Sequence, residues 1–189
     1  RRSAPLVASA NTAIFASRLE SIATEMGELL RRTALSVNVK ERLDFSCGLL
    51  DPAGELVVNA PHVPVHLGAL GVCVRGLVGS IALEPGDVVV TNHPAFGGSH
   101  LPDITVVTPV FDDDHGTLLG FAASRAHHAE IGGVRPGSMP PDATSLAEEG
   151  VVIAPMHVVR RGASRLESFE ALLGAGPHPS RSPADNLAD

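Results

Sequence analysis

A long apolar stripe with helical spacing governs the first part of the chain. Its members lie three and four positions apart, and Glu20, Glu25 and Glu28 fall mostly outside it. The stripe consists of Phe15, Leu19, Ile22, Met26, Leu29 and Thr33, and it is widened by Ile14, Ala23 and Leu30. This spacing is that of an amphipathic α-helix. We therefore predict a helix over residues 12–35, with Asn11 as its N-cap.

A hairpin pattern follows the helix. Residues 45–50 and 56–59 flank the sequence Asp-Pro-Ala-Gly, in which Pro presets one turn angle and Gly supplies a positive φ. The two runs therefore predict a pair of antiparallel strands. A second helix is expected over residues 67–81, and its glycines either weaken this prediction or indicate close packing against a neighbouring element.

The later part of the chain is rich in β-branched residues. Strands are predicted over residues 88–91, 104–111, 118–124 and 151–159, and a polar turn joins the second of these to the third. These elements predict an α+β fold, a mixed or antiparallel sheet with a long N-terminal helix and a second packing helix. From Gly174 the chain is rich in Pro, Ser, Asn and Asp. We therefore expect one domain over residues 1–175, with residues 176–189 as a loop or boundary.

Composition and charge exclude several classes of function. The chain has 189 residues, of which 44% are hydrophobic and 19% charged, as in globular proteins. Its net charge of −7 provides no electrostatic surface for nucleic acid or an anionic membrane. No apolar run reaches the roughly 18 residues that a membrane span requires. The two cysteines, Cys47 and Cys73, lie in apolar settings, so buried reduced thiols and a cytoplasmic location are expected.

Six of the nine histidines lie in clusters at the edges of predicted strands, beside Gly or Pro turns. The clusters are His62 with His66, His93 and His100 with Asp103, and His127 and His128 with Glu130. Reactive side chains on loops that a rigid sheet holds in place are typical of functional sites. Pro64 argues against a helical His62–His66 pair, so an extended loop lining a cleft is expected there. His93 is expected to be a turn residue, and His157 a satisfied histidine on a sheet face.

The sequence Gly-Gly-Ser-His-Leu-Pro-Asp over residues 97–103 gives the sharpest chemical prediction. Imidazole and carboxylate together are ligands for Zn, Mn or Fe, and an open coordination position would make the ion a Lewis acid. His127 or His128 would be the third ligand, because Asp103 begins one predicted strand and His127 follows its antiparallel partner. The alternative is that His100 and Asp103 belong to a capping turn and that the histidine pair lies on the surface.

Arg125 also stands out, because a charge near the end of an apolar strand needs a carboxylate partner. Asp103, Asp44 and Glu130 are the candidates. The motifs of other common chemistries are missing from the sequence: no GxxxxGK[ST] P-loop, no GxGxxG at a helix start, no GxSxG elbow and no HExxH.

Several sequence blocks, in order along nearly the whole chain, resemble the B subunits of hydantoinases. The blocks cover residues 31–34, 39–47, 62–68, 97–104, 125–133, 136–140 and 186–189. This family comprises the B subunits of N-methylhydantoinases, the matching half of 5-oxoprolinases, and related subunits of acetone and acetophenone carboxylases. The resemblance implies an ATP-coupled reaction at an amide, lactam or ketone. A partner A-type subunit would use ATP to phosphorylate the substrate oxygen, and the B part would supply a divalent metal site.

The resemblance also assigns roles to residues. His100, Asp103 and His127 are implied as metal ligands, with His128 as the alternative third ligand, and the catalytic assignments are His66, Arg125 and His128. The implied reaction is hydrolysis of a cyclic amide, in an oligomer with the A-type subunit. Ketone carboxylation, or a non-catalytic metal-binding or scaffold module, remains as an alternative. Such B subunits are longer, so residues 1–175 are expected to be the N-terminal metal-site domain and a C-terminal portion to be missing.

Overall fold

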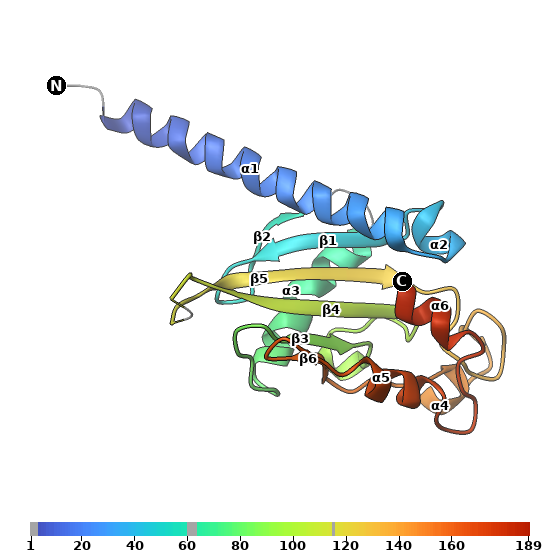
Figure 1. Cartoon of the computed structure of the whole chain (residues 1–189). Helices are drawn as coiled ribbons and strands as arrows, with labels where there is room; N and C mark the ends of the chain where they lie inside the picture. Colours follow the sequence, from blue (N-terminus) through green and yellow to red (C-terminus); the bar gives the residue numbers. More distant parts are fainter. Residues whose placement is uncertain (1–3, 60–63, 115) are drawn as a thin grey trace.

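The computed structural model describes residues 4–59, 64–114 and 116–189, and its centre is one antiparallel sheet (Figure 1). Seven strands within these residues pair in the order β2-β1-β5-β4-β3-β6-β7. They are β1 (Phe45–Leu50), β2 (Leu56–Asn59), β3 (Val88–Thr91), β4 (Asp103–Phe111), β5 (Leu118–His127), β6 (Met156–Arg160) and β7 (Ala163–Ser164). All neighbouring strands are antiparallel, which confirms the predicted α+β class.

The predicted hairpin has its physical cause in the turn between β1 and β2. The Asp51 carboxylate accepts hydrogen bonds from the backbone N–H groups of Ala53 and Glu55, each at 2.9 Å. Gly54 has a φ of 78°, which favours glycine. Both strands therefore begin and end where the sequence places them. The strand β5 runs three residues further than predicted, and this extension includes Arg125 and His127 in the sheet.

Helices cover both faces of the sheet. They are α1 (Ala4–Thr33), α2 (Val37–Lys40), α3 (Pro64–Val78), α4 (Leu146–Glu149), α5 (Leu166–Leu173) and α6 (Pro183–Ala188), with a 3₁₀ turn η1 (Pro94–Phe96). In Figure 1, α3 lies behind the strands, whereas α1 runs along β1 and β2 and projects beyond them. The two large helices confirm the predicted long N-terminal helix and second packing helix, but the prediction of Asn11 as an N-cap is wrong, because α1 begins at Ala4. The short helices α2, α4, α5 and α6 are additional to the prediction.

The helix α1 buries a narrower face than its sequence indicates. Ala23 is fully buried, and Met26 and Leu30 pack against a cluster that includes Phe45. By contrast, Phe15 is 65% exposed, since its part of the helix projects beyond the sheet (Figure 1). None of the helices in the described ranges combines the length and apolar character needed to cross a membrane.

Two further apolar clusters fix the layers of the fold. Behind the sheet, residues of α3 such as Leu70 and Leu77 pack against Val107 and Phe121. On the other face, Phe169 of α5 packs in a cluster with Ile104. Side chains of β4 alternate between these two clusters, while β5 contributes Phe121 to the first and Ala126 to the cluster beneath α1, as the strand period of two requires. The face of any residue on these two strands therefore follows from its position.

The prediction of a strand from residue 151 is wrong, because β6 begins only at Met156. Residues 151–153 are instead held by the side chain of Asn92, which is buried. Its Nδ2 donates to the carbonyl of Val151 at 2.9 Å, and its Oδ1 accepts from the N–H of Ile153 at 2.7 Å. Thr91 Oγ1 adds a bond to the Ile153 carbonyl. Side-chain hydrogen bonds thus replace a strand ladder here.

The segment after Gly174 is more ordered than its composition indicates. A loop was expected throughout, but residues 183–188 form α6, in which Asn186 is buried and Leu187 packs against the α5 cluster. Pro183 stands in the first turn of this helix, a position that proline favours. The domain boundary at residue 175 stays a prediction.

Candidate metal centre

The strand register brings the predicted ligands together at one edge of the sheet. Asp103 is the first residue of β4, and it pairs directly with His127, the last residue of β5. His100 stands in the loop between η1 and β4, three residues before Asp103. The sequence placed these residues at the same sheet end, and the register confirms that placement.

Three atoms that could bind a metal ion face one another in this cluster. His100 Nε2 lies 2.8 Å from His127 Nδ1, and Asp103 Oδ1 lies 3.1 Å from His127 Nδ1 and 3.4 Å from His100 Nε2. All three atoms lie within 4.8 Å of one another. The Asp103 side chain is fully buried, while those of His127 and His100 are 12% and 34% exposed. The cluster is therefore open to solvent on the His100 side.

Other side chains hold the Asp103 carboxylate in place. His66 Nε2 lies 3.4 Å from Asp103 Oδ2, and Ser99 Oγ donates to the same oxygen at 3.1 Å. His66 Nδ1 in turn faces Ser46 Oγ of β1 at 3.4 Å. His66 lies in the first turn of α3, so the expected extended loop is wrong at this residue. Pro64 begins the helix instead of preventing it.

The charges of the cluster favour the protonation states that bind metal ions. Burial alone raises the pKa of Asp103, but hydrogen bonds from His127 and His66 outweigh it and hold that pKa below its usual range. Burial lowers the pKa of His100, and this effect, together with the neighbouring imidazoles, outweighs the Asp103 carboxylate, which raises it. At neutral pH, Asp103 is thus a carboxylate and His100 a neutral imidazole.

The residues present fit a divalent ion. Two imidazole nitrogens and one carboxylate oxygen on one side of a site form the 2-His-1-carboxylate set, which leaves coordination positions open. The two nitrogens point at each other, and carboxylate charge lies beside them. This donor set suits Zn, Mn or Fe.

Arg125 lies on the same face of the sheet as the cluster, two residue pairs further along the β4–β5 ladder. Its side chain is fully buried, and Nε donates to Thr105 Oγ1 at 2.7 Å while Nη2 donates to the Gly97 carbonyl at 2.9 Å. The prediction that Arg125 has a carboxylate partner is wrong, since no ion pair within the described residues includes Arg125. Nη1 has no hydrogen-bond partner within the described residues.

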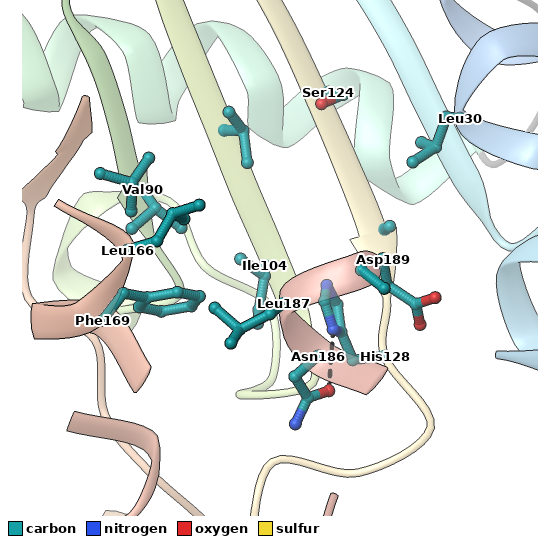
Figure 2. A pocket seen from close by; sticks show the side chains of 14 residues that line it. Leu30, Val90, Ile104, Ser124, His128, Leu166, Phe169, Asn186, Leu187 and Asp189 are labelled. Carbon is teal, nitrogen blue, oxygen red and sulfur yellow. Dashed lines mark hydrogen bonds between the residues drawn. The ribbon is translucent and has the colours of Figure 1, made fainter. Parts of the chain in front are cut away.

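His128 points to the other face of the sheet. It lines a cavity of about 220 Å³ together with Ile104 and Ala126, which alternate with Asp103 and His127 along their strands. Figure 2 shows His128 Nδ1 joined to Asn186 Oδ1 of α6, at a distance of 2.9 Å. Burial lowers the pKa of His128. The structure therefore separates His128 from the cluster of His100, Asp103 and His127.

The carboxylate of Glu130 fastens the C-terminal segment to the sheet end. Oε1 accepts from Ser180 Oγ at 2.6 Å and from the N–H groups of Arg181 and Ser182 at 3.0 Å. Oε2 accepts from the N–H of Gly132 at 2.6 Å. Burial raises the pKa of Glu130, but these hydrogen bonds outweigh it, so that the pKa is lowered.

A Glu130→Gln substitution is expected to destabilise the fold by about 2 kcal/mol, because an amide NH₂ meets donors where the carboxylate accepts. Since its pKa is lowered on folding, Glu130 stabilises the fold above the unfolded-state pKa of about 4.3, and this contribution is lost as the pH falls through the folded-state pKa. Urea unfolding at pH 7 and pH 3.5 measures the destabilisation and its pH dependence. The difference in free energy of unfolding between the variant and the parent should be smaller at pH 3.5 than at pH 7. Glu25→Gln, on the exposed face of α1, is the matched control. Equal stability of parent and variant at pH 7 would contradict this account.

Two further histidines, His93 and His157, have structural surroundings. His93 accepts a hydrogen bond from the N–H of Ala95 at the start of η1, which confirms its turn role. His157 lies 3.2 Å from the Asp87 carboxylate and bonds the Ala82 carbonyl, as expected of a satisfied sheet histidine. His62 lies outside the described residues. The sequence did not indicate the roles of Asn92 and Ser99, because their partners are set by the three-dimensional packing.

The chain is similar to proteins of one family over nearly its whole length. Residues 9–189 match the hydantoinase B/oxoprolinase family. The 5-oxoprolinase 1 of Arabidopsis thaliana is 56% identical over 162 residues, which cover 85% of this chain and 13% of that protein. The 5-oxoprolinase of Saccharomyces cerevisiae is 50% identical over 184 residues, covering 93% of this chain and 14% of that protein.

Solved structures share the fold. The ATP-dependent caprolactamase of Pseudomonas jessenii matches with a TM-score of 0.75 and 29% identity, covering 94% of this chain and 31% of that one. Nucleotide-free acetone carboxylase matches with a TM-score of 0.74 and 22% identity, covering 86% of this chain and 22% of that one, a likeness of fold alone. The chain spans less than a third of the length of each of these proteins. By its sequence over residues 9–189, the chain belongs to the hydantoinase B/oxoprolinase family.

Proposed function

We propose that this chain holds the divalent metal site of an ATP-dependent hydrolase of cyclic amides. The observation that carries the proposal is the group of His100 Nε2, Asp103 Oδ1 and His127 Nδ1 at the edge of the sheet. Relatives bear the names 5-oxoprolinase and ATP-dependent caprolactamase, and both names denote enzymes that act on a cyclic amide. ATP would be used by an A-type partner subunit or domain, consistent with the lack of a P-loop motif in this sequence.

The positions of the residues assign them different roles in this proposal. His100, Asp103 and His127 would hold the ion, which would polarise a substrate oxygen or activate water. In the metal-free chain Asp103 is a carboxylate whose charge is stabilised by hydrogen bonds from His127 and His66, and an ion bound to His127 Nδ1 would replace the first of these bonds. His66 and Ser99 hold Asp103 Oδ2, so that Oδ1 stays directed at the two ligand nitrogens. These contacts fix the ligand carboxylate before a substrate binds.

His66 and Arg125 are assigned positioning roles in this proposal, because each reaches the ligands through another residue. His66 acts on Asp103 directly, and Arg125 acts on the loop that carries His100. His128 is left out of the reaction, since it faces the opposite side of the sheet and bonds Asn186. Its role is to join α6 to the end of β5.

The test is ring opening by the chain combined with a hydantoinase A-type subunit. With 5-oxoproline, ATP and Zn or Mn, the mixture is expected to form glutamate together with ADP and phosphate. His127→Ala should abolish glutamate formation, because it removes a ligand, whereas His178→Ala on the C-terminal loop should leave it intact. Bicarbonate-dependent carboxylation of a ketone with no lactam hydrolysis would overturn the proposed reaction. Loss of neither activity in His127→Ala would overturn the proposed site.

A further inference from the structure

His100 differs from the other two ligands because it stands on a loop. Asp103 and His127 lie within paired strands, whereas His100 belongs to the segment between η1 and β4. Its side chain is also the most exposed of the three, at 34%. The geometry of the cluster therefore depends on whatever holds this loop in position.

Two buried side chains hold the loop, one at each end. Arg125 Nη2 donates to the carbonyl of Gly97 at 2.9 Å, three residues before His100. Asn92 Nδ2 donates to the carbonyl of Leu101 at 2.8 Å, one residue after it. The Arg125 side chain is itself fixed by the bond from Nε to Thr105 Oγ1, which belongs to β4 next to Asp103.

The surroundings of Arg125 are unusual for a buried cation. Within the described residues the guanidinium has two neutral oxygen acceptors, no ion pair with a carboxylate, and one nitrogen without a partner. An apolar side chain of similar length would fill this volume without the desolvation cost of a charge. What an apolar side chain could not do is donate a charge-assisted hydrogen bond to the Gly97 carbonyl.

We propose that Arg125 is a positioning residue that holds the Gly97 carbonyl and thereby places His100 for metal binding. This inference rests on the proposed function, since it requires that the cluster binds an ion. Gly97 has a φ of 78°, and a Cβ there would lie 2.8 Å from the backbone nitrogen of Cys73 in α3. The loop is thus pressed between α3 and the sheet, with Arg125 beneath it.

The direction in which metal affinity changes when Arg125 is removed distinguishes a positioning role from simple charge repulsion. A buried positive charge close to a cation site repels the ion, so its removal alone would strengthen metal binding. If Arg125 instead positions His100, its removal weakens metal binding even though the repulsion disappears. The two explanations predict opposite changes in affinity.

The experiment is titration of the metal-free chain with Co²⁺, followed by visible absorption. Arg125→Met is expected to lower the Co²⁺ affinity about 10- to 100-fold and to change the absorption band, as for other residues that orient a ligand. Arg75→Met is the matched control, because Arg75 also donates to the carbonyl of a positive-φ glycine, Gly54, at the β1–β2 turn. The Co²⁺ affinity of the Arg75→Met variant should stay within about twofold of that of the parent.

Two further variants keep the test decisive if Arg125→Met folds poorly. Thr105→Val keeps the charge but removes the acceptor of Arg125 Nε, so a smaller fall of about 3- to 10-fold is expected. In a His100→Ala background, Arg125→Met should change the remaining affinity less than about twofold, because its target is already absent. Equal or tighter Co²⁺ binding in both Arg125→Met and Thr105→Val would overturn this inference and leave the metal site standing. No Co²⁺ binding by the parent would overturn the metal site and the inference together.

Discussion

An Asn92→Ala substitution is expected to destabilise the fold by about 4 kcal/mol. The side chain of Asn92 is buried and bonds three backbone groups: the carbonyls of Leu101 and Val151 and the N–H of Ile153. Alanine leaves all three buried without a partner, and each unsatisfied group costs about 1–3 kcal/mol. Part of this cost is regained where the loops relax and admit water.

Urea unfolding of the metal-free protein measures this loss. Asn38→Ala is the control, since Asn38 is partly exposed in α2 and its side chain has only a long contact of 3.4 Å with Arg42. The control should change the free energy of unfolding by less than about 0.5 kcal/mol. A loss below about 1 kcal/mol for Asn92→Ala would mean that the segment of residues 151–153 does not depend on these bonds.

An Asp103→Asn substitution is expected to lower the affinity for a divalent ion by more than about 100-fold. The carboxylate is the sole charged ligand of the cluster, and it is fully buried beside His66, His100 and His127. Asparagine keeps the shape but removes the charge, and it presents an NH₂ group to one side of the site. Loss of a direct ligand should exceed the roughly 10- to 100-fold effect typical of outer contacts.

Isothermal titration with Zn²⁺ or Mn²⁺ measures this affinity, and Asp87→Asn provides the control. Asp87 is also a fully buried carboxylate that faces a histidine, His157 at 3.2 Å, and it accepts two backbone hydrogen bonds. Asp87→Asn should lower stability but leave the metal affinity unchanged. If both substitutions weaken binding equally, the effect comes from general loss of structure and not from the cluster.

The sheet end that carries Asp103 and His127 could be predicted because short sequence patterns define the two strands that form it. A β-branched run defines β4, an apolar run defines β5, and a polar turn joins them; antiparallel pairing then brings Asp103 opposite His127. The same reasoning places the β1–β2 hairpin, because the Asp51 side chain and Gly54 determine that turn within five residues. Where the forces act between neighbours in sequence, the predictions are confirmed.

The predictions are wrong where distant contacts decide the structure. Residues 151–153 have a strand composition, but Asn92 binds their backbone groups and no strand forms. Arg125 was expected to need a carboxylate, whereas the Gly97 carbonyl and Thr105 hydroxyl meet it across the fold. The prediction of an extended loop at His66 is wrong because Pro64 starts a helix instead of breaking one.

The long helix shows a further limit of periodicity. Its apolar stripe predicts a helix correctly but not how much of the stripe is buried, since burial depends on the extent of the sheet beneath it. Ala23 is buried in a cluster with Phe45 and Cys47 of β1, while Phe15 is exposed. The stripe predicts the helix, and the neighbouring elements determine how much of it is buried.

The most direct test of the account is elemental analysis of the purified chain beside a His100→Ala, Asp103→Ala double variant. The account predicts close to one Zn, Mn or Fe ion per parent chain, and none in a double variant whose circular dichroism shows a folded protein. A parent that remains free of metal after reloading with each of these ions would contradict the account. Equal metal content in the parent and the folded double variant would contradict it as well, since the ion would then be bound elsewhere.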